Sequence, residues 1–222
     1  GCDVAINKLG NIDLNLYDIT AGTGRQTIVY QTSRECYWNK CIYCVDLPLP
    51  KQGYRERDTK LVINDIKELI NKYQMSFLEI SNATISPSQL EALSKAIIRE
   101  GLKFRWRVFA RLDNGFTSKI FRLAEKAGCK VIMFGFESAN QRVLDFISKG
   151  VRVETSLRII RDCHRAGIHV ALQTMIGLPS ETISEATDTI QFLIENRRYI
   201  ANVTFNIYYL TPACQVYLNP EH

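Results

Sequence analysis

Three cysteines, Cys36, Cys41 and Cys44, fall within nine residues and have the spacing CxxxxCxxC. Cysteine thiolates are ligands for zinc ions and for iron–sulfur clusters. A closed zinc site or a fully ligated cluster takes four protein ligands, and the sequence has no fourth cysteine near this loop. The spacing therefore predicts a metal centre with one open coordination position, where chemistry can take place.

Charged residues also interrupt or end two apolar, strand-like runs. Glu137 directly follows the run 130–136, where a buried carboxylate without a partner would be costly. Arg105, Arg107 and Arg111 alternate with apolar residues, and they could hold an anionic substrate or the carboxylate of a cofactor. We expect at least one of the three arginines to be an ion-pair partner inside the fold.

The composition is that of an ordinary globular protein, with 222 residues, 46% of them hydrophobic, and a net charge of +5. Its basic residues are mixed with acidic ones, which argues against a nucleic-acid partner. We find no signal peptide and no apolar run of membrane-spanning length, so we expect a cytoplasmic protein without membrane contact. Seven cysteines favour metal ligation in a reducing compartment over a disulfide framework. A start at Gly1 instead of Met predicts a piece of a longer protein.

A unit of amphipathic helix, glycine and β-rich run recurs along the chain. Glycine just past a helix supplies the left-handed cap from which the chain turns into the next strand. Thr182 and Glu185 have the spacing of a capping box at the start of a further helix. The three copies of the unit span residues 88–110, 118–136 and 155–175, with Gly101, Gly128 and Gly167 after their helices.

Six strands are predicted, and a helix follows each of the first five, which favours a parallel sheet with right-handed crossovers. Six β/α units are too few to close an eight-stranded barrel. The fold class is therefore α/β, a partial (β/α)6 TIM-like barrel with a six-stranded parallel sheet over residues 27–222. Residues 1–26 do not fit the repeat and are expected to form an N-terminal extension or linker, with an edge strand near 12–16. The six strands are expected near 27–32, 76–80, 103–109, 130–136, 168–175 and 202–209.

The alternation along these strands separates an apolar row from a polar one. On the last strand, for example, Val203, Phe205 and Ile207 alternate with polar residues. We expect the apolar rows to pack under the helices and the polar rows to face the interior, as in a barrel that holds a large polar ligand. The alternative is that some polar rows lie on solvent-exposed strand edges.

The cysteine motif, the FGFES segment at 134–138 and the GLPSET segment at 177–182 resemble the radical S-adenosylmethionine (radical SAM) superfamily. The resemblance implies that the three cysteines bind three irons of a 4Fe–4S cluster and that SAM chelates the fourth. One electron from such a cluster cleaves SAM to methionine and a 5′-deoxyadenosyl radical. The usual spacing in the family is CxxxCxxC, so this chain carries one extra residue in the first gap.

The resemblance also implies a set of SAM-binding residues. Glu137 would bind the ribose or the methionine amine, and Gln173 would contact ribose hydroxyls. Ser81 and Asn82 match a segment that binds the methionine amine, with a turn leading into a helix as the alternative. Lys149 matches a basic position for the methionine carboxylate, with a solvated lysine as the alternative. The full set is Tyr43, Ser81, Asn82, Arg111, Glu137, Lys149, Gln173 and Leu178.

A narrower resemblance links the segments 13–17, 33–38 and 110–113 to cobalamin-binding radical SAM proteins, many of which are methyltransferases. It implies a cobalamin cofactor, carried by a domain that would precede Gly1 and is absent from this chain. The expected function is thus a radical SAM enzyme core, as part of a cobalamin-dependent methyltransferase. Its expected partners are a small-molecule or peptide substrate and an electron donor such as flavodoxin or ferredoxin.

Two other functions stay open. One is a cobalamin-independent radical SAM enzyme that modifies a peptide or a cofactor. The other is a zinc-stabilised barrel acting as a binding module, in which a distant histidine joins the three cysteines. Outside the motif, Cys129 and Cys163 have the sequence context of core residues. Cys214 follows the last strand and is either an incidental cysteine or a catalytic thiol.

Overall fold

The computed structural model describes residues 6–8, 27–44, 53–73, 75–212 and 214–218. The expected edge strand near 12–16 and most of the proposed N-terminal extension lie outside the described residues. Six strands form one parallel sheet in the order β1-β4-β5-β6-β7-β8, and a separate antiparallel pair joins β2 to β3. The strands are β1 (Thr27–Tyr30), β2 (Ser33–Arg34), β3 (Arg55–Glu56), β4 (Phe77–Ile85), β5 (Arg105–Arg111), β6 (Cys129–Glu137), β7 (His169–Ile176) and β8 (Asn202–Ile207).

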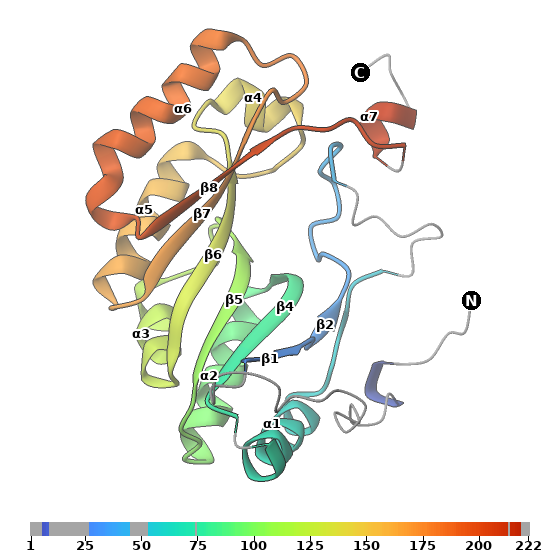
Figure 1. Cartoon of the computed structure of the whole chain (residues 1–222), viewed down its shortest axis with the longest axis vertical. Helices are drawn as coiled ribbons and strands as arrows, with labels where there is room; N and C mark the ends of the chain where they lie inside the picture. The colour runs from blue at the N-terminus through green and yellow to red at the C-terminus, as the bar shows by residue number, and fades with distance from the viewer. Residues whose placement is uncertain (1–5, 9–26, 45–52, 74, 213, 219–222) are drawn as a thin grey trace.

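Helices connect the strands and lie against one side of the sheet. Figure 1 shows α3, α5 and α6 along this side, with β2 and α7 across the sheet from them. This arrangement confirms the predicted α/β fold with a six-stranded parallel sheet in an open, partial barrel. The helices are α1 (Thr59–Tyr73), α2 (Pro87–Arg99), α3 (Ser118–Lys126), α4 (Gln141–Phe146), α5 (Val153–Arg165), α6 (Ile183–Asn196) and α7 (Gln215–Leu218), with 3-10 turns at Ile6–Lys8 and Arg197–Tyr199.

The main hydrophobic core lies between the sheet and these helices. Trp106 and Phe134 from the strands are fully buried there. The predicted glycine turns at the helix ends are confirmed, since all three glycines have positive φ. At Gly128 a side chain is also excluded by packing, because a Cβ atom would lie 2.2 Å from the carbonyl oxygen of Phe104. The positions of the strands therefore follow from the helix-ending glycines.

The last strand differs from the prediction. The alternation predicts Phe205 and Ile207 under a helix, but the two residues are 52% and 69% exposed. The reason is that β8 is the edge of the sheet, and α7, the helix that follows it, has only four residues. Val203, at the start of the strand, does pack against the core. The apolar row of β8 is therefore buried only at the end that α6 and its neighbours reach.

The three arginines of β5 have three different environments. Arg105 is exposed at the amino end of the strand, and Arg111 is buried at the carboxyl end. Arg107 lies between them and its Nε donates to the Glu79 carboxylate of β4 at 2.9 Å. The expected ion pair within the barrel is thus confirmed at Arg107, and only Arg111 lies at the end of the sheet where the cysteine motif begins.

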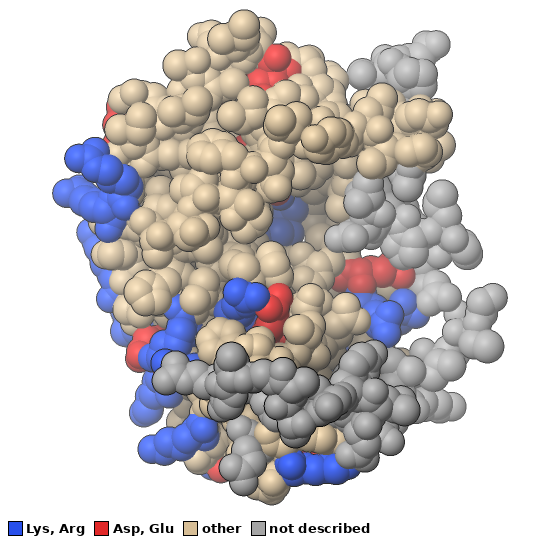
Figure 2. Space-filling view, in the orientation of Figure 1, with Lys and Arg blue, Asp and Glu red and all other residues tan. Residues whose placement is uncertain are grey.

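Charged side chains are unevenly spread on the face seen in Figure 2, where Lys and Arg gather along the left edge and the bottom. The upper part of this face is mostly free of charge, and a basic and an acidic residue lie side by side near its middle. In the part of the chain that the structure describes, no helix combines the length and the apolar character needed to span a bilayer.

Candidate functional site

The candidate site lies at the carboxyl ends of the parallel strands, which form the functional edge of such sheets. The cysteine loop, residues 35–44, follows β1 and β2. Arg111 is the last residue of β5 and Glu137 is the last residue of β6. Lys149 comes from the connection between α4 and α5. Four separate segments therefore bring sulfur and charged side chains to one edge of the sheet.

The cysteine loop is bent at two places, and its three cysteines form no disulfide. Glu35 and Asn39 have positive φ values of 62° and 50°. The backbone amide of Cys44 donates to the carbonyl of Cys41 at 3.2 Å, which closes the second gap into a turn. Cys41 is buried, whereas Cys36 and Cys44 are half-buried. The bend at Asn39, a residue type that tolerates the left-handed region, accommodates the longer first gap.

Two cations flank the sulfur of Cys41. The Nη1 atom of Arg111 lies 3.8 Å from the Cys41 Sγ atom. Burial raises the pKa of the Cys41 thiol, while the positive charges of Lys149 and Arg111 act in the opposite direction. The cations thus offset part of the cost of burying the thiolate, which is the form of cysteine that binds metals.

The cysteine loop offers three thiols as metal ligands. In the described ranges, no three His, Cys, Asp or Glu side chains are gathered around one point that could hold a metal ion. An iron–sulfur cluster spreads its thiolate ligands over several irons. Three thiols on one bent loop, with two cations beside them, are a donor set that a negatively charged, thiolate-bound cluster would fit.

Glu137 and Lys149 form a buried ion pair. The Nζ atom of Lys149 lies 2.6 Å from Oε1 of Glu137, and both side chains are 6% exposed. The Tyr43 hydroxyl donates to the same Oε1 at 3.0 Å and accepts from Lys149 at 3.0 Å. Burial, together with the neighbouring Glu137 carboxylate, raises the pKa of Tyr43. Glu137 therefore has a partner that the sequence did not reveal, and the alternative of a solvated Lys149 is wrong.

Two polar atoms of this cluster stay without a hydrogen-bond partner among the described residues. They are Nε of Arg111 and Oε2 of Glu137, and both are buried. Buried polar atoms in native structures are nearly always paired, so such exceptions need an explanation. One is a positively charged donor and the other a negatively charged acceptor, which is the pattern that a zwitterionic ligand would satisfy.

Ser81 and Asn82 lie within β4, so the alternative of a turn leading into a helix is wrong, since α2 begins at Pro87. The Asn82 side chain is buried and its Oδ1 accepts from the backbone amides of Thr32 and Ser33, at 2.8 and 3.2 Å. Its contacts hold the segment between β1 and the cysteine loop. Ser81 is half-buried and its carbonyl accepts from the Gln31 side chain at 3.1 Å.

The segment after β7 reaches the same edge of the sheet. The Glu181 carboxylate accepts from the backbone amide of Gly177 at 2.7 Å and thereby closes the turn. Leu178 is buried in a small second core, against which Ile42 and Tyr43 of the cysteine loop also pack. Gln173 of β7 is half-buried, and its amide lies 3.4 Å from the Thr204 hydroxyl of β8.

Cys214 lies near the cysteine loop but is engaged elsewhere. Its Sγ donates to the Thr211 carbonyl at 3.1 Å and lies 3.6 Å from the Tyr208 hydroxyl. Two residues later, the amide of Val216 donates to the carbonyl of Ile42 at 3.1 Å. The C-terminal segment is thus tied to the cysteine loop, and the Cys214 thiol bonds within that segment.

Sequence reasoning missed the aromatic residues of the first gap. The Tyr37 hydroxyl donates to the Asp113 carboxylate at 2.8 Å, and Trp38 contacts the connection between α4 and α5. Adjacent tyrosine and tryptophan side chains inside a ligand loop were the available signal, because large amphipathic rings seldom stay without packing partners.

Acid sensitivity is expected from the cap of α6, which follows the turn at Leu178. The hydrogen bond from Arg142, together with that from the Thr182 amide, lowers the pKa of Glu185 from its ordinary value of 4.5 to about 2. Because the folded-state pKa is depressed, the stabilisation is complete above the ordinary value and is lost as the pH falls towards 2. Urea denaturation of the Glu185→Gln variant should show a weaker loss of unfolding free energy on acidification than the wild type. Equal slopes in the two proteins between about pH 5 and pH 2 would contradict this prediction.

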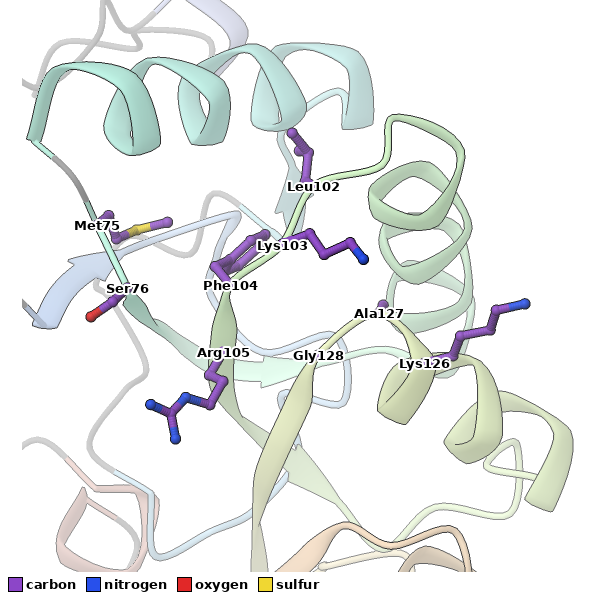
Figure 3. Close-up of a pocket in the computed structure, with 9 residues that line it drawn as sticks. All are labelled: Met75, Ser76, Leu102, Lys103, Phe104, Arg105, Lys126, Ala127 and Gly128. Carbon is purple, nitrogen blue, oxygen red and sulfur yellow. The ribbon is translucent and has the colours of Figure 1, made fainter.

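A cavity of about 450 Å³ lies at the opposite edge of the sheet, at the amino ends of β4, β5 and β6. Figure 3 shows that the Arg105 and Lys126 side chains at its rim point away from each other. The cavity is therefore separate from the cysteine loop, and its cations do not converge on a common point.

The model of the radical SAM superfamily matches residues 30–193 of the chain. Among curated proteins, an uncharacterized methyltransferase of Pyrococcus horikoshii is 31% identical over 166 residues, which cover 74% of this chain and 36% of that protein. An anaerobic magnesium-protoporphyrin IX monomethyl ester cyclase of Cereibacter sphaeroides is 26% identical and matches 81% of this chain and 30% of its own length. The chain thus spans about a third of the length of these relatives.

Solved structures share the fold. The radical SAM methyltransferase TsrM from Kitasatospora setae, solved with cobalamin and a 4Fe–4S cluster bound, superposes with a TM-score of 0.78 at 17% identity, over 88% of this chain and 39% of TsrM. The cobalamin-dependent SAM radical enzyme OxsB superposes with a TM-score of 0.64 at 16% identity, over 74% of this chain and 26% of OxsB. At these identities the comparison establishes a common fold.

Proposed function

The chain belongs to the radical SAM superfamily, and we propose that it forms the core of an enzyme that binds a 4Fe–4S cluster and SAM and cleaves SAM reductively. Cys36, Cys41 and Cys44 would be the protein ligands of the cluster. When bound, such a cluster supplies the single electron that breaks the sulfonium of SAM into methionine and a 5′-deoxyadenosyl radical. The chain's own side chains bind and orient SAM at the open edge of the sheet.

The main support for this proposal is that two buried charged atoms, Nε of Arg111 and Oε2 of Glu137, have no hydrogen-bond partner among the described residues. The methionine part of SAM has an ammonium group and a carboxylate, and the buried Nε of Arg111 and Oε2 of Glu137 have the charges that pair with them. Lys149 fixes the Glu137 carboxylate through its other oxygen. A ligand with one charge alone would leave one of these two atoms unpaired and buried, at a cost of about 1–3 kcal/mol or more.

The surrounding residues have different proposed roles. Leu178 belongs to the small second core and Tyr43 packs against it, and the two would form an apolar wall for the adenine. Gln173 would contact the ribose from the neighbouring strand. We propose that Asn82 supports the cysteine loop through its hydrogen bonds to Thr32 and Ser33, and that it acts on SAM binding only through that loop.

The finer class that we propose is a cobalamin-dependent methyltransferase. The relatives that support it are the methyltransferase of P. horikoshii and the fold neighbours TsrM and OxsB. Because the chain spans about a third of its relatives, cobalamin would be held by a part of the protein outside this chain. The substrate would be a small molecule or a peptide, and a flavodoxin or ferredoxin would supply the electron.

Anaerobic reconstitution with iron and sulfide tests the core of the proposal. The protein should become brown, contain about four irons per chain, and release methionine and 5′-deoxyadenosine when SAM and a strong reductant are added. The measurements are iron and sulfide content, absorbance, and chromatography of the SAM products. The uptake of one zinc ion into a colourless protein that leaves SAM intact would contradict the proposal and favour the zinc-stabilised binding module.

A further inference from the structure

The turn after α4, residues 147–150, presents consecutive backbone carbonyls to the cysteine loop. Two of its residues, Ser148 and Gly150, have positive φ values of 54° and 68°. This backbone turns three successive carbonyls towards donors that come from elsewhere in the chain. The donors on the carbonyls of Ile147, Ser148 and Lys149 are, in order, the Ile42 amide at 3.1 Å, the Trp38 indole at 2.8 Å and the Arg111 guanidinium at 2.5 Å.

Trp38 packs directly over the last residue of this turn. A Cβ atom on Gly150 would lie 1.9 Å from Cζ2 of Trp38 and within 2.7 Å of two further ring atoms. Real side chains do not approach that closely, so any residue other than glycine at this position displaces the indole. Glycine is therefore required at position 150 for two reasons: the positive φ of its backbone and the Trp38 ring that lies against it.

The same indole contacts the cation beside the cluster ligand. The guanidinium carbon of Arg111 lies 4.7 Å from the centre of the Trp38 ring, within the range of a cation–π interaction. Through its two terminal nitrogens Arg111 also reaches Cys41 Sγ and the Lys149 carbonyl. Because Arg111 is buried, its guanidinium depends on the Trp38 ring and the Lys149 carbonyl to hold this position.

From these contacts we propose that Trp38 is a positioning residue for the cluster. It docks the cysteine loop on the 147–150 turn and holds the Arg111 guanidinium against the sulfur of Cys41. The longer gap between Cys36 and Cys41 makes this docking possible, because it carries Trp38 on a bend at Asn39. This inference rests on the proposed function, since it assigns Trp38 a role in retaining the cluster that the cysteines would bind.

A pair of glycine variants separates docking from backbone strain. Gly150→Ala pushes against Trp38, whereas Gly101→Ala has nearly the same φ, +65°, and no atom within 4 Å of its new Cβ. Both variants carry the strain of a left-handed alanine. We expect only Gly150→Ala to lose iron to an anaerobic chelator faster, by about tenfold, as is typical when outer contacts of a metal site are removed.

The two tryptophans of the chain provide a second matched pair. Trp106, like Trp38, donates its indole N–H to a backbone carbonyl, that of Ala127 at 2.9 Å, but it lies at the other end of the sheet. Trp38→Phe should accelerate iron loss and shift the electron paramagnetic resonance spectrum of the reduced cluster. Trp106→Phe should lower the unfolding free energy and leave both cluster properties unchanged.

Docking can also be measured without a cluster. In cluster-free Trp106→Phe protein, Trp38 is the sole tryptophan, and acrylamide should quench its fluorescence more strongly after the additional change Gly150→Ala. Adding Gly101→Ala instead should leave the quenching unchanged. In a Trp38→Ala background, Gly150→Ala should no longer accelerate iron loss, because the displaced ring is gone.

The failure of this inference differs from the failure of the proposed function. A wild-type protein that forms no cluster contradicts the proposed function. A wild-type protein that forms the cluster, with Trp38→Phe and Gly150→Ala indistinguishable from Trp106→Phe and Gly101→Ala in chelator resistance and spectrum, overturns the role of Trp38 alone.

Discussion

Replacement of Cys41 by alanine is expected to abolish the 4Fe–4S cluster and, with it, the reductive cleavage of SAM. Cys41 is the buried member of the three thiols, and it is the one that Arg111 contacts. Two thiolates from Cys36 and Cys44 would leave two irons without protein ligands. Iron and sulfide content after anaerobic reconstitution measures the first effect, and the release of 5′-deoxyadenosine measures the second.

The fold should survive this change, because Cys41 belongs to neither hydrophobic core cluster. Circular dichroism and a cooperative urea transition would verify that. Cys214→Ala is the matched control, since Cys214 is also buried and lies on a segment tied to the cysteine loop. It should keep the cluster. Full cluster absorbance in the Cys41→Ala protein, or its loss in the Cys214→Ala protein, would show that the ligand assignment is wrong.

Lys149→Met is expected to lower the free energy of unfolding by about 3–5 kcal/mol, because it leaves the Glu137 carboxylate buried beside an apolar side chain. The two charged groups are 2.6 Å apart and almost inaccessible to water. Urea denaturation at neutral pH measures this change. The double variant Lys149→Met with Glu137→Gln should recover much of the loss, since no uncompensated charge remains.

Lys67→Met provides the comparison at an exposed ion pair. Lys67 contacts Glu100 at 2.8 Å, but their side chains are 41% and 30% exposed. Its removal should cost between about 0 and 1 kcal/mol, as surface pairs usually do. Equal losses for Lys149→Met and Lys67→Met would mean that water screens the Glu137–Lys149 pair, and the double variant would then show no recovery.

The sequence alone determined the architecture and the identity of the chemical groups. Glycines after three helices indicated where the following strands begin, and the apolar alternation indicated which face of each strand is buried. Both signals can be read from the sequence because they are local. The three cysteines predicted a metal centre from their spacing within a single loop. Glu137 stood out because a carboxylate at the end of an apolar strand requires a partner.

The tertiary structure decided which partners these groups have. Glu137 pairs with Lys149, Asn82 holds the segment before the cysteine loop, and Arg111 lies between the Trp38 ring and Cys41. These contacts join different strands and connections, so no sequence periodicity encodes them. In addition, the strand register shifts between Ile80 and Ile85 and between Gly135 and Glu137.

These shifts lie at the carboxyl ends of β4 and β6, where Asn82 and Glu137 are found. A shift in register changes the face on which a side chain lies, so simple alternation fails there. The sequence could therefore predict that the polar residues end up at one edge of the sheet. Only the packing of the loops, with Trp38 over Gly150, determined how those residues face one another.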